Sequence, residues 1–437
     1  MDSIDTLIHA RFVLPIEPHG TVLARHAVAI QDGRIVAVLP SAEASARYQA
    51  AEVVHRDQHA LLPGLVNAHT HLAMTLLRGL ADDLPLERWL TDHVWPAETR
   101  WVSHGFVGDG AELAIAESLR GGVTCVNDMY FFPDATARAA AHAGIRASLG
   151  LVVLDLPTSW ARDADEYLHK GLAARDAHRN DPLLSFMLAP HAPYSVSDAA
   201  FARIGVLAAE LEVPVHVHLH ETAREVAEAE ARDGRRPLAR LDALGLLGPE
   251  LLAVHMTQLT AAEVALCAER GLSVAHCPES NLKLASGFCP VAALLAAGVE
   301  VALGTDGAAS NNDLDMFGEL RTAALLAKAV ARDPTVLSAH AALRMATLSG
   351  ARALGLGRQI GSLEAGKWAD LIAVEVGSLE QQPLYDVASQ LCYATGRERV
   401  SDAWVAGRAL LRDRGLLTLD EEALLVRAAE WRQRIRP

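Results

Sequence analysis

The sequence predicts an α/β protein in which a (β/α)8 barrel of the TIM type is joined to a small β-sandwich domain formed by both chain ends. In the middle of the chain, apolar runs of strand length alternate with helical stretches rich in Ala, Leu, Glu and Arg, a pattern typical of βα units. At both ends, short apolar segments are separated by turns that contain glycine, which favours antiparallel strands. With 437 residues, of which 51% are hydrophobic, the chain is long and apolar enough to bury the core of a barrel and of a second, smaller domain.

The N-terminal segment carries a hairpin signal. Apolar residues at 27–30 and 35–39 flank a connection with an Asp-Gly pair, which is favoured in tight hairpin turns. Segments 366–374 and 400–408, near the other end, also have the composition of strands interrupted by glycine. We therefore expect the two ends to pair into one domain. The expected order is the first part of this domain, the barrel, and the second part with a terminal helix, at residues 1–62, 63–364 and 365–437.

Eight apolar runs between the ends have the length of barrel strands. They lie at residues 65–71, 123–128, 145–151, 184–190, 213–218, 251–256, 272–276 and 299–304. Eight parallel strands can close into a barrel, and such barrels carry their catalytic residues at the carboxyl ends of the strands. Candidate functional residues are therefore sought where these runs end.

Charge and cysteine content restrict the partners. The formal net charge of −15 argues against nucleic acid, which binds clustered Lys and Arg, and favours a small-molecule substrate. The five cysteines are odd in number and form no Cys-x-x-Cys motif, so we expect buried thiols of a cytoplasmic protein. The N-terminus lacks the pattern of a signal peptide and no stretch has the length of a membrane span, so we expect no membrane association.

A His-x-His motif at the end of the first run indicates a metal site. His69 and His71 are separated by one residue, so a strand would place both imidazoles on the same face. Divalent zinc accepts His nitrogen and Asp oxygen as ligands, and catalytic zinc sites keep one position for water. The motif therefore predicts hydrolytic chemistry if further ligands follow.

The fifth run offers three more histidines. His216 and His218 share a strand face, so either can point into the barrel, whereas His220 is expected beyond the strand end. Glu221 follows within reach of the same cavity, which favours His218 as the ligand.

Two further residues occupy matching positions. His255 closes the sixth run, and Asp306 follows the eighth. A metal held by imidazoles and a carboxylate lowers the pKa of water toward neutrality, and Asp306 and His255 can hydrogen-bond that water and accept its proton. Glu221 can carry a proton to a ring nitrogen of the substrate and then to the leaving group. This set suits hydrolysis at an electron-poor C–N bond.

Two other metal chemistries are disfavoured. The fourth run ends without a lysine that could form a carbamate bridge, so one metal ion is expected instead of a binuclear centre. The zinc site of the cytidine deaminases needs a Pro-Cys-x-x-Cys motif, and Cys277-Pro278 has no such partner.

The assembled motifs resemble the amidohydrolase superfamily, and within it the 5-methylthioadenosine/S-adenosylhomocysteine deaminases and their chlorohydrolase relatives. The resemblance covers essentially the whole chain. The segments that carry it are residues 63–71, 74–79, 82–85, 89–90, 95–98, 128–130, 190–194, 218–222, 280–284 and 304–312.

The resemblance implies a role for each site residue. The metal ligands would be His69, His71, His218 and Asp306, and the proton-transfer groups Glu221 and His255. Glu98 would accept hydrogen bonds from ribose hydroxyls, since a carboxylate facing two hydroxyls can accept from both. Trp89 and His191 would contact the nucleoside. The resemblance assigns no specific role to Asn281, Lys283 and Ser286, which would line the mouth of the same cavity.

One position departs from the family pattern. Family members that accept the homocysteine moiety well place arginines near its carboxylate, but Leu151 stands where one such arginine is expected. Arg162 can compensate from a loop or be a solvated surface charge. The apolar stretch from residue 150 to 157 instead suits methylthio or unmodified adenosine.

The leading hypothesis is hydrolytic deamination at C6 of an adenine nucleoside, a reaction at the C–N bond of a cyclic amidine. The alternative is an aminohydrolase or chlorohydrolase of the same group acting on a guanine-type base or a triazine, for which Glu98 would have no ribose to bind. A non-catalytic metal-binding protein is the third reading, but such a protein needs no proton shuttle like Glu221. The expected cofactor is one divalent ion, zinc before iron or manganese, and we expect a homo-oligomer.

Overall fold

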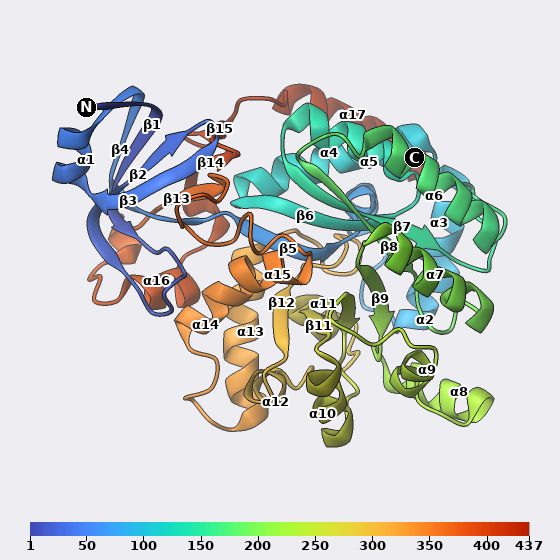
Figure 1. The fold of residues 1–437 in the computed structure, drawn as a ribbon. Coiled ribbons are helices and arrows are strands. Elements are labelled where there is room, and N and C mark those ends of the chain that lie inside the picture. The colour runs from blue at the N-terminus through green and yellow to red at the C-terminus, as the bar shows by residue number, and fades with distance from the viewer. Residues whose placement is uncertain (437) are drawn as a thin grey trace.

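The computed structural model describes residues 1–436, and within them it contains two eight-stranded sheets. Figure 1 shows the sheet formed by the two chain ends on one side of the molecule and the barrel on the other. The barrel strands are parallel and adjacent in chain order. They are β5 Leu65–Thr70, β6 Val123–Tyr130, β7 Arg146–Val153, β8 Leu184–Pro190, β9 Val215–Leu219, β10 Leu251–His255, β11 Ser273–His276 and β12 Glu300–Leu303.

Each predicted barrel run coincides with a strand, which confirms the barrel. The barrel closes between its first and last strands, because the Asp306 backbone N–H, just after β12, donates to the His69 carbonyl of β5 at 3.0 Å. Gly304 permits this approach, since a Cβ atom there would lie 2.8 Å from the backbone nitrogen of His69. Closure therefore brings the loop after β12 against the His-x-His motif.

Helices follow the strands on the outside of the barrel. The first connection is the longest and contains η1 Leu72–Leu77, α2 Leu86–Trp89, the π-helix η2 Leu90–Val94, α3 Trp95–Trp101 and α4 His104–Arg120. The others hold α5 Pro133–Ala143, α6 Ala164–His178, α7 Asp198–Leu211, α8 Ala223–Asp233, α9 Pro237–Ala243, α10 Ala261–Arg270, α11 Pro278–Lys283, α12 Val291–Ala296, α13 Met316–Ala331, α14 Ala339–Arg344, η3 Met345–Ser349 and α15 Gly350–Ala353. Among the described residues, no helix is both long and apolar enough to cross a membrane.

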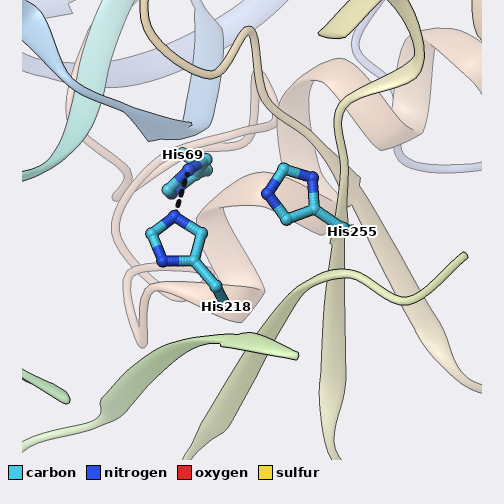
Figure 2. Close-up of side chains that lie close together, drawn as sticks. All are labelled: His69, His218 and His255. Carbon is cyan, nitrogen blue, oxygen red and sulfur yellow. Dashed lines mark hydrogen bonds between the residues drawn. The ribbon is translucent and has the colours of Figure 1, made fainter. Parts of the chain in front are cut away.

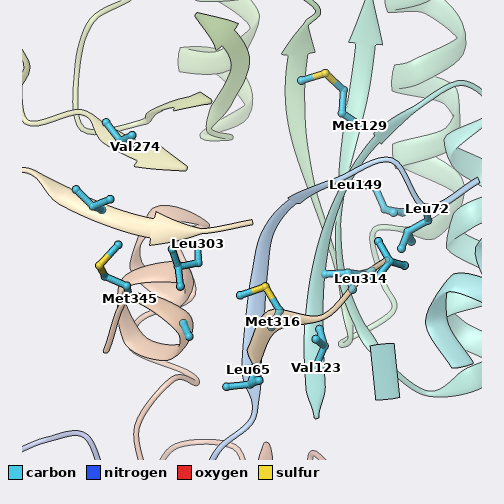
Figure 3. Close-up of a cluster of buried hydrophobic side chains, with 14 of the residues drawn as sticks. Leu65, Leu72, Val123, Met129, Leu149, Val274, Leu303, Leu314, Met316 and Met345 are labelled. Carbon is cyan, nitrogen blue, oxygen red and sulfur yellow. The ribbon is translucent and has the colours of Figure 1, made fainter. Parts of the chain in front are cut away.

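Apolar side chains fill the space between the strands and these helices. Leu65 and Leu303, from the first and last barrel strands, belong to one buried cluster with Met316 of α13 and Met345 of η3 (Figure 3). Burial of such side chains is the main favourable term in folding, about 25 cal/mol per Å² of apolar surface. The packed core holds the strand ends, and thus the functional residues, in fixed positions.

The second sheet joins the two chain ends, as predicted. Its strands are β1 Asp2–Val13, β2 Leu23–Gln31, β3 Arg34–Pro40, β4 Tyr48–Pro63, β13 Leu371–Glu375, β14 Val400–Val405, β15 Arg408–Arg412 and β16 Gly415–Leu416. β13 pairs antiparallel with β4, with Leu371 opposite Pro63. The edge strand β3 also meets the segment that precedes β13, because the backbone N–H of Ile35 donates to the Lys367 carbonyl at 2.9 Å.

The Asp-Gly pair forms the expected hairpin between β2 and β3. Asp32 and Gly33 have φ values of 51° and 73°, the left-handed conformations of a type I′ turn. The remaining elements are α1 Ser41–Arg47, η4 Leu379–Gln381, α16 Val387–Tyr393, η5 Arg397–Arg399 and α17 Glu421–Ile435. The C-terminal helix α17 docks on α4 through a 2.8 Å hydrogen bond from Trp431 Nε1 to Asp109.

Candidate functional site

A cavity of about 450 Å³ lies at the carboxyl ends of the barrel strands. Its polar floor is formed by His71, His218, Glu221, His255 and Asp306, together with His191. Its walls are largely apolar, and many of them come from the long first connection and the loop after β7. These wall residues are Leu86, Trp89, Leu90, Val94, Trp95, Phe131, Val152, Leu154, Leu156 and Pro157.

The metal-type donors, which are the ring nitrogens and carboxylate oxygens able to bind a metal ion, lie close together at the floor of the cavity. The Nε2 atom of His69 lies 3.2 Å from Nε2 of His218 and 3.3 Å from Oδ1 of Asp306, and His71 Nε2 lies 3.2 Å from the same oxygen. Figure 2 shows His69 and His218 pointing at each other, with the ring of His255 beside them. Two sets can each place their ligand atoms within 4.8 Å, namely His69 with His71 and Asp306, and His69 with His218 and His255.

Hydrogen bonds orient the rings. The Nδ1 atom of His71 donates to the Met129 carbonyl at 2.6 Å, and that of His218 donates to the His191 carbonyl at 2.8 Å. With the proton on Nδ1, the neutral form of each ring has its lone pair on Nε2, facing the cluster. Burial lowers the pKa of His71, but its hydrogen bond with Asp306 and the charge of that carboxylate outweigh burial and raise it to about 9. Burial lowers the pKa of His69 to about 3, so its ring is neutral, the form that binds metal.

Asp306 is held in a demanding conformation. Its φ of 60° is left-handed, which is uncommon for a residue other than glycine and is found at functional sites where the surroundings enforce it. Ser280 and Ser310 donate to Oδ2 at 2.6 and 2.8 Å. Burial alone would raise the pKa of Asp306, but hydrogen bonds with His69 and His71 outweigh it and hold the pKa well below its usual value. The carboxylate is therefore ionised and available as a ligand.

Glu221 and His255 form a second pair beside the donors. The Oε2 atom of Glu221 lies 3.9 Å from Nε2 of His255. His255 donates through Nδ1 to Oδ1 of Asn281 at 2.9 Å, which leaves Nε2 as an acceptor. Burial raises the pKa of Glu221, so its protonated form persists to a higher pH than in water. The pair thus contains one group suited to donate a proton and one suited to accept it.

The three histidines of the fifth strand have different surroundings. His216 and His218 both point into the barrel, but only His218 is in contact with both the cavity and His69. His216 lies deeper, fully buried, with its Nε2 atom 2.9 Å from Nδ1 of His69. His220 follows the end of β9, as expected, and its Nε2 atom accepts from the backbone N–H of Leu238 at 3.0 Å.

The residues expected to contact a nucleoside also line the cavity. Glu98 is half-buried, and its Oε1 atom accepts a 2.6 Å hydrogen bond from the Tyr130 hydroxyl. Trp89 and His191 complete this part of the lining. Sequence reasoning missed Tyr130 as the partner of Glu98, although Asp128-Met129-Tyr130 was among the recognised segments. No sequence signal connected the two residues.

The three residues expected at the mouth of the cavity, Asn281, Lys283 and Ser286, have different surroundings. Asn281 and Ser286 contact the pair of Glu221 and His255, since Asn281 Oδ1 is 2.9 Å from His255 Nδ1 and Ser286 Oγ is 3.5 Å from Glu221 Oε1. Lys283 instead pairs with Asp82 at 2.7 Å. Arg162 is a surface residue, with a side chain 82% exposed and paired with Glu166, and it is not part of the cavity wall.

The donor set fits a divalent metal ion. Three imidazole nitrogens and one ionised carboxylate are the ligand types that zinc prefers, and two of the imidazoles are oriented by backbone carbonyls as metal-binding histidines usually are. Residues His69, His71, His218 and Asp306 can hold such an ion, with Glu221 and His255 beside it.

Comparison with known proteins gives the family. The model of the amidohydrolase family matches residues 60–410. A 5-methylthioadenosine/S-adenosylhomocysteine deaminase from Teredinibacter turnerae is 49% identical over 99% of this chain and 98% of its own length. A protein of the same name from Saccharophagus degradans is 46% identical over 99% and 97%.

Solved structures agree with this comparison. An adenosine deaminase from Xanthomonas campestris with bound zinc superposes with a TM-score of 0.99 at 59% identity, covering 100% of this chain and 99% of that one. A zinc-containing atrazine chlorohydrolase from Arthrobacter aurescens has the same fold, with a TM-score of 0.90 at 24% identity over 98% and 99% of the two chains. The chain therefore belongs to the amidohydrolase family.

Proposed function

We propose that this protein is a metal-dependent hydrolase that deaminates C6 of an adenine nucleoside, giving the inosine analogue and ammonia. The substrate class comprises 5′-methylthioadenosine, adenosine and S-adenosylhomocysteine. The observation that carries the proposal is the Glu221 and His255 pair, 3.9 Å apart, beside the metal-type donors and at the floor of a cavity that also contains Glu98. The names of the relatives that are 46–49% identical support the same reaction.

We assign the metal ligands to His69, His71, His218 and Asp306. A divalent ion in this position supplies a Lewis acid that makes water nucleophilic near neutral pH. Zinc is the expected ion because the adenosine deaminase from Xanthomonas campestris contains it, and iron and manganese are the alternatives.

The proton-transfer groups act in sequence. Protonated Glu221 donates to a ring nitrogen of the purine, which makes C6 more electrophilic. The Nε2 atom of His255 and the carboxylate of Asp306 hydrogen-bond the attacking water and accept its proton. The first transfer leaves Glu221 as a carboxylate, which takes up the proton released by the water and delivers it to the amino group. The C6–N bond then breaks with release of ammonia, and the proton of the new C6 hydroxyl restores the acid form of Glu221. The raised pKa of Glu221 suits this role because the acid must be protonated at the start.

Glu98 is proposed to recognise the ribose. Tyr130 occupies Oε1 of its carboxylate, which leaves Oε2 to accept from a hydroxyl. Trp89 and His191 would contact the nucleoside from other parts of the wall. A free base lacks the hydroxyls, so this carboxylate favours nucleosides over guanine-type bases.

The remaining wall favours an uncharged group at the 5′ position. Among the described residues that line the cavity there is no lysine or arginine, and its carboxylates are those of Glu98, Glu221 and Asp306. Leu154 and Leu156 offer apolar surface instead. A methylthio group can bury against such a wall, whereas the carboxylate of homocysteine would have no cationic partner among the residues that line this cavity. Arg232, Arg235 and Arg240 line a neighbouring pocket, which shares Leu156 and Tyr194 with the cavity. Among the three candidates we therefore favour 5′-methylthioadenosine and adenosine.

The proposal is tested by ammonia release from zinc-loaded protein. The substrates are 5′-methylthioadenosine, adenosine, S-adenosylhomocysteine, guanine and a chlorotriazine. We expect the two nucleosides with uncharged 5′ groups to give the highest kcat/KM. Turnover of guanine or dechlorination of the triazine, without turnover of any nucleoside, would replace the proposal by the alternative activity.

We also propose that the protein acts in the cytoplasm as a homo-oligomer. All five cysteines are free and buried, which suits a reducing compartment. Leu379 and Tyr385, near each other in the chain, expose 87% and 94% of their surface, and we propose that a second copy of the chain covers them. Light scattering would give the oligomeric state, and a monomer at micromolar concentration would contradict the second part.

A further inference from the structure

A buried histidine that is not a proposed ligand touches the centre of the donor cluster. His216 on β9 is 0% exposed, and its Nε2 atom lies 2.9 Å from Nδ1 of His69. The two rings are nearly perpendicular, at 80°, with centroids 5.0 Å apart. On the other side of His216, Nδ1 lies 3.3 Å from the amide nitrogen of Asn127. His69, His216 and Asn127 thus form a chain of polar groups in the barrel interior.

This contact differs from those of the other site histidines. His71 and His218 donate through Nδ1 to backbone carbonyls, and His255 donates to the side-chain oxygen of Asn281. Those partners are carbonyl or amide oxygens, which can only accept a hydrogen bond, so the ring nitrogen that faces them must carry the proton. For His69 the only hydrogen-bond partner of Nδ1 within the described residues is the imidazole of His216. Its orientation and its proton therefore depend on a second titratable ring.

From this chain we infer that His216 is a positioning residue, which accepts the Nδ1 proton of His69 in a hydrogen bond and thereby fixes the lone pair of His69 Nε2 toward the metal ligands. The inference rests on the proposed metal site. A neutral imidazole carries one proton, so a lone pair at Nε2 requires the proton on Nδ1. The proton on Nδ1 is buried and needs an acceptor, and His216 Nε2 supplies it.

Asn127 completes the chain. When His216 accepts at Nε2, its own proton lies on Nδ1 and needs an acceptor in turn. The Oδ1 atom of Asn127 is buried and has no hydrogen-bond partner among the described residues, while Nδ2 of the same amide donates to the Ala68 carbonyl at 2.8 Å. The same Nδ2 atom faces His216 Nδ1 at 3.3 Å, so Oδ1 reaches that nitrogen only if the amide rotates and gives up its hydrogen bond to Ala68. Metal binding through Nε2 of His69 therefore requires the Asn127 amide to reorient, and its unpartnered Oδ1 is the acceptor available for this.

The test compares zinc affinity in two variants of His216. His216→Leu removes the acceptor in a side chain of similar size, and His216→Gln keeps an amide oxygen near the position of Nε2. His276→Leu is the matched control, because His276 is also buried in the barrel, on β11, and its Nδ1 atom has no partner among the described residues. The full-length proteins are stripped of metal, and the dissociation constant for zinc is measured by competition with a chromophoric chelator.

We expect His216→Leu to weaken zinc binding about 10–100-fold, the usual effect of removing the partner of a metal-bound histidine. His216→Gln and His276→Leu should bind as the wild type does. Equal affinity in His216→Leu and wild type, or equal loss in His216→Leu and His216→Gln, would overturn the inference. If the wild type itself binds no zinc, the proposed function fails, which is a different result from tight binding by all four proteins.

A second measurement detects the hydrogen bond in the wild-type protein itself. In wild-type protein labelled with ¹⁵N-histidine and loaded with zinc, we expect an ¹⁵N–¹⁵N coupling across the hydrogen bond between His69 Nδ1 and His216 Nε2. The signals of His216 are identified by their absence in His216→Gln. A proton found on His216 Nε2, or no coupling between the two rings, would overturn the inference.

Discussion

The Oε2 atom of Glu221 lies 3.9 Å from Nε2 of His255, and neither side chain is more than 12% exposed. The two groups come from the ends of neighbouring strands, since Glu221 follows β9 and His255 closes β10. His255 has a φ of 73°, so its backbone adopts the left-handed region at the point where the strand ends. The fold thus places an acid with a raised pKa and a proton acceptor side by side.

Replacing Glu221 tests its role as the proton carrier. Glu221→Gln keeps the shape of the side chain and its contact with Ser286 but removes the transferable proton. We expect kcat to fall at least about 10²–10⁴-fold, the usual contribution of one positioned acid or base, while zinc content stays at the wild-type level. Ammonia release and metal analysis of the same preparation give the two values. Near-normal turnover would remove Glu221 from the mechanism.

Replacing Glu98 tests ribose recognition. Glu98→Ala removes the carboxylate that Tyr130 orients, so adenosine should lose more of its kcat/KM than a free base such as adenine. One to three kcal/mol is the usual cost of an unmade hydrogen bond, which corresponds to a loss of about 5–150-fold for the nucleoside. Tyr130→Phe is the control, since it keeps the carboxylate and should cost less. Equal losses for the nucleoside and the base would contradict ribose recognition.

The preference of the cavity wall for an uncharged 5′ group is tested with substrates whose 5′ groups have similar length but different charge. 5′-Butylthioadenosine has an extended apolar group, whereas S-adenosylhomocysteine carries a charged one of comparable length. We expect butylthioadenosine to retain kcat/KM near that of methylthioadenosine. The kcat/KM for S-adenosylhomocysteine should fall about 100-fold or more, because placing its carboxylate and ammonium against an apolar wall costs several kcal/mol of desolvation.

A substitution in the cavity wall should reverse the preference for an uncharged 5′ group. Leu156 lines the mouth of the cavity and is 54% exposed, so an arginine can be accommodated there. Leu156→Arg should raise kcat/KM for S-adenosylhomocysteine and lower it for butylthioadenosine. A wild-type enzyme that accepts S-adenosylhomocysteine as well as butylthioadenosine would contradict the assignment of the wall.

The sequence was sufficient for the barrel because each strand is a buried apolar run with a distinct helical stretch after it. It was also sufficient to bring His71, His218, His255 and Asp306 to one end of the barrel, since the carboxyl ends of parallel strands meet there. Periodicity alone could not separate His216 from His218, because residues two apart on a strand share a face. The difference between them arises from depth in the barrel, which depends on contacts between strands.

Other features had no local signal. Tyr130 meets Glu98 across 32 positions of the chain, and the cavity wall from Leu86 to Val94 belongs to an irregular connection with a π-helix. Such contacts are set by the packing of the long first connection over the barrel. Arg162 illustrates the opposite case, because its pairing with Glu166 at i, i+4 on the surface is purely local.

A buried ion pair joins the barrel to the second sheet. Arg146 on β7 donates through Nε to Asp370 at 2.8 Å, and the two side chains are 3% and 1% exposed. Arg146→Met leaves the Asp370 carboxylate buried without its partner, so the free energy of unfolding should fall by about 3–5 kcal/mol. Urea unfolding followed by circular dichroism measures the change. Arg162→Ala, which breaks an exposed pair, is the control and should unfold as the wild type does; equal effects of the two variants would contradict this prediction.

The most direct test of the proposed reaction is the fate of water oxygen in 5′-methylthioadenosine. Zinc-loaded protein and protein stripped by a chelator are incubated with the nucleoside in H₂¹⁸O, and the product is analysed by mass spectrometry. We predict methylthioinosine with one ¹⁸O atom at C6 and one equivalent of ammonia, formed only with the metal and restored when zinc is added back. Unchanged nucleoside, or equal turnover after the metal is removed, would contradict metal-dependent deamination at this site.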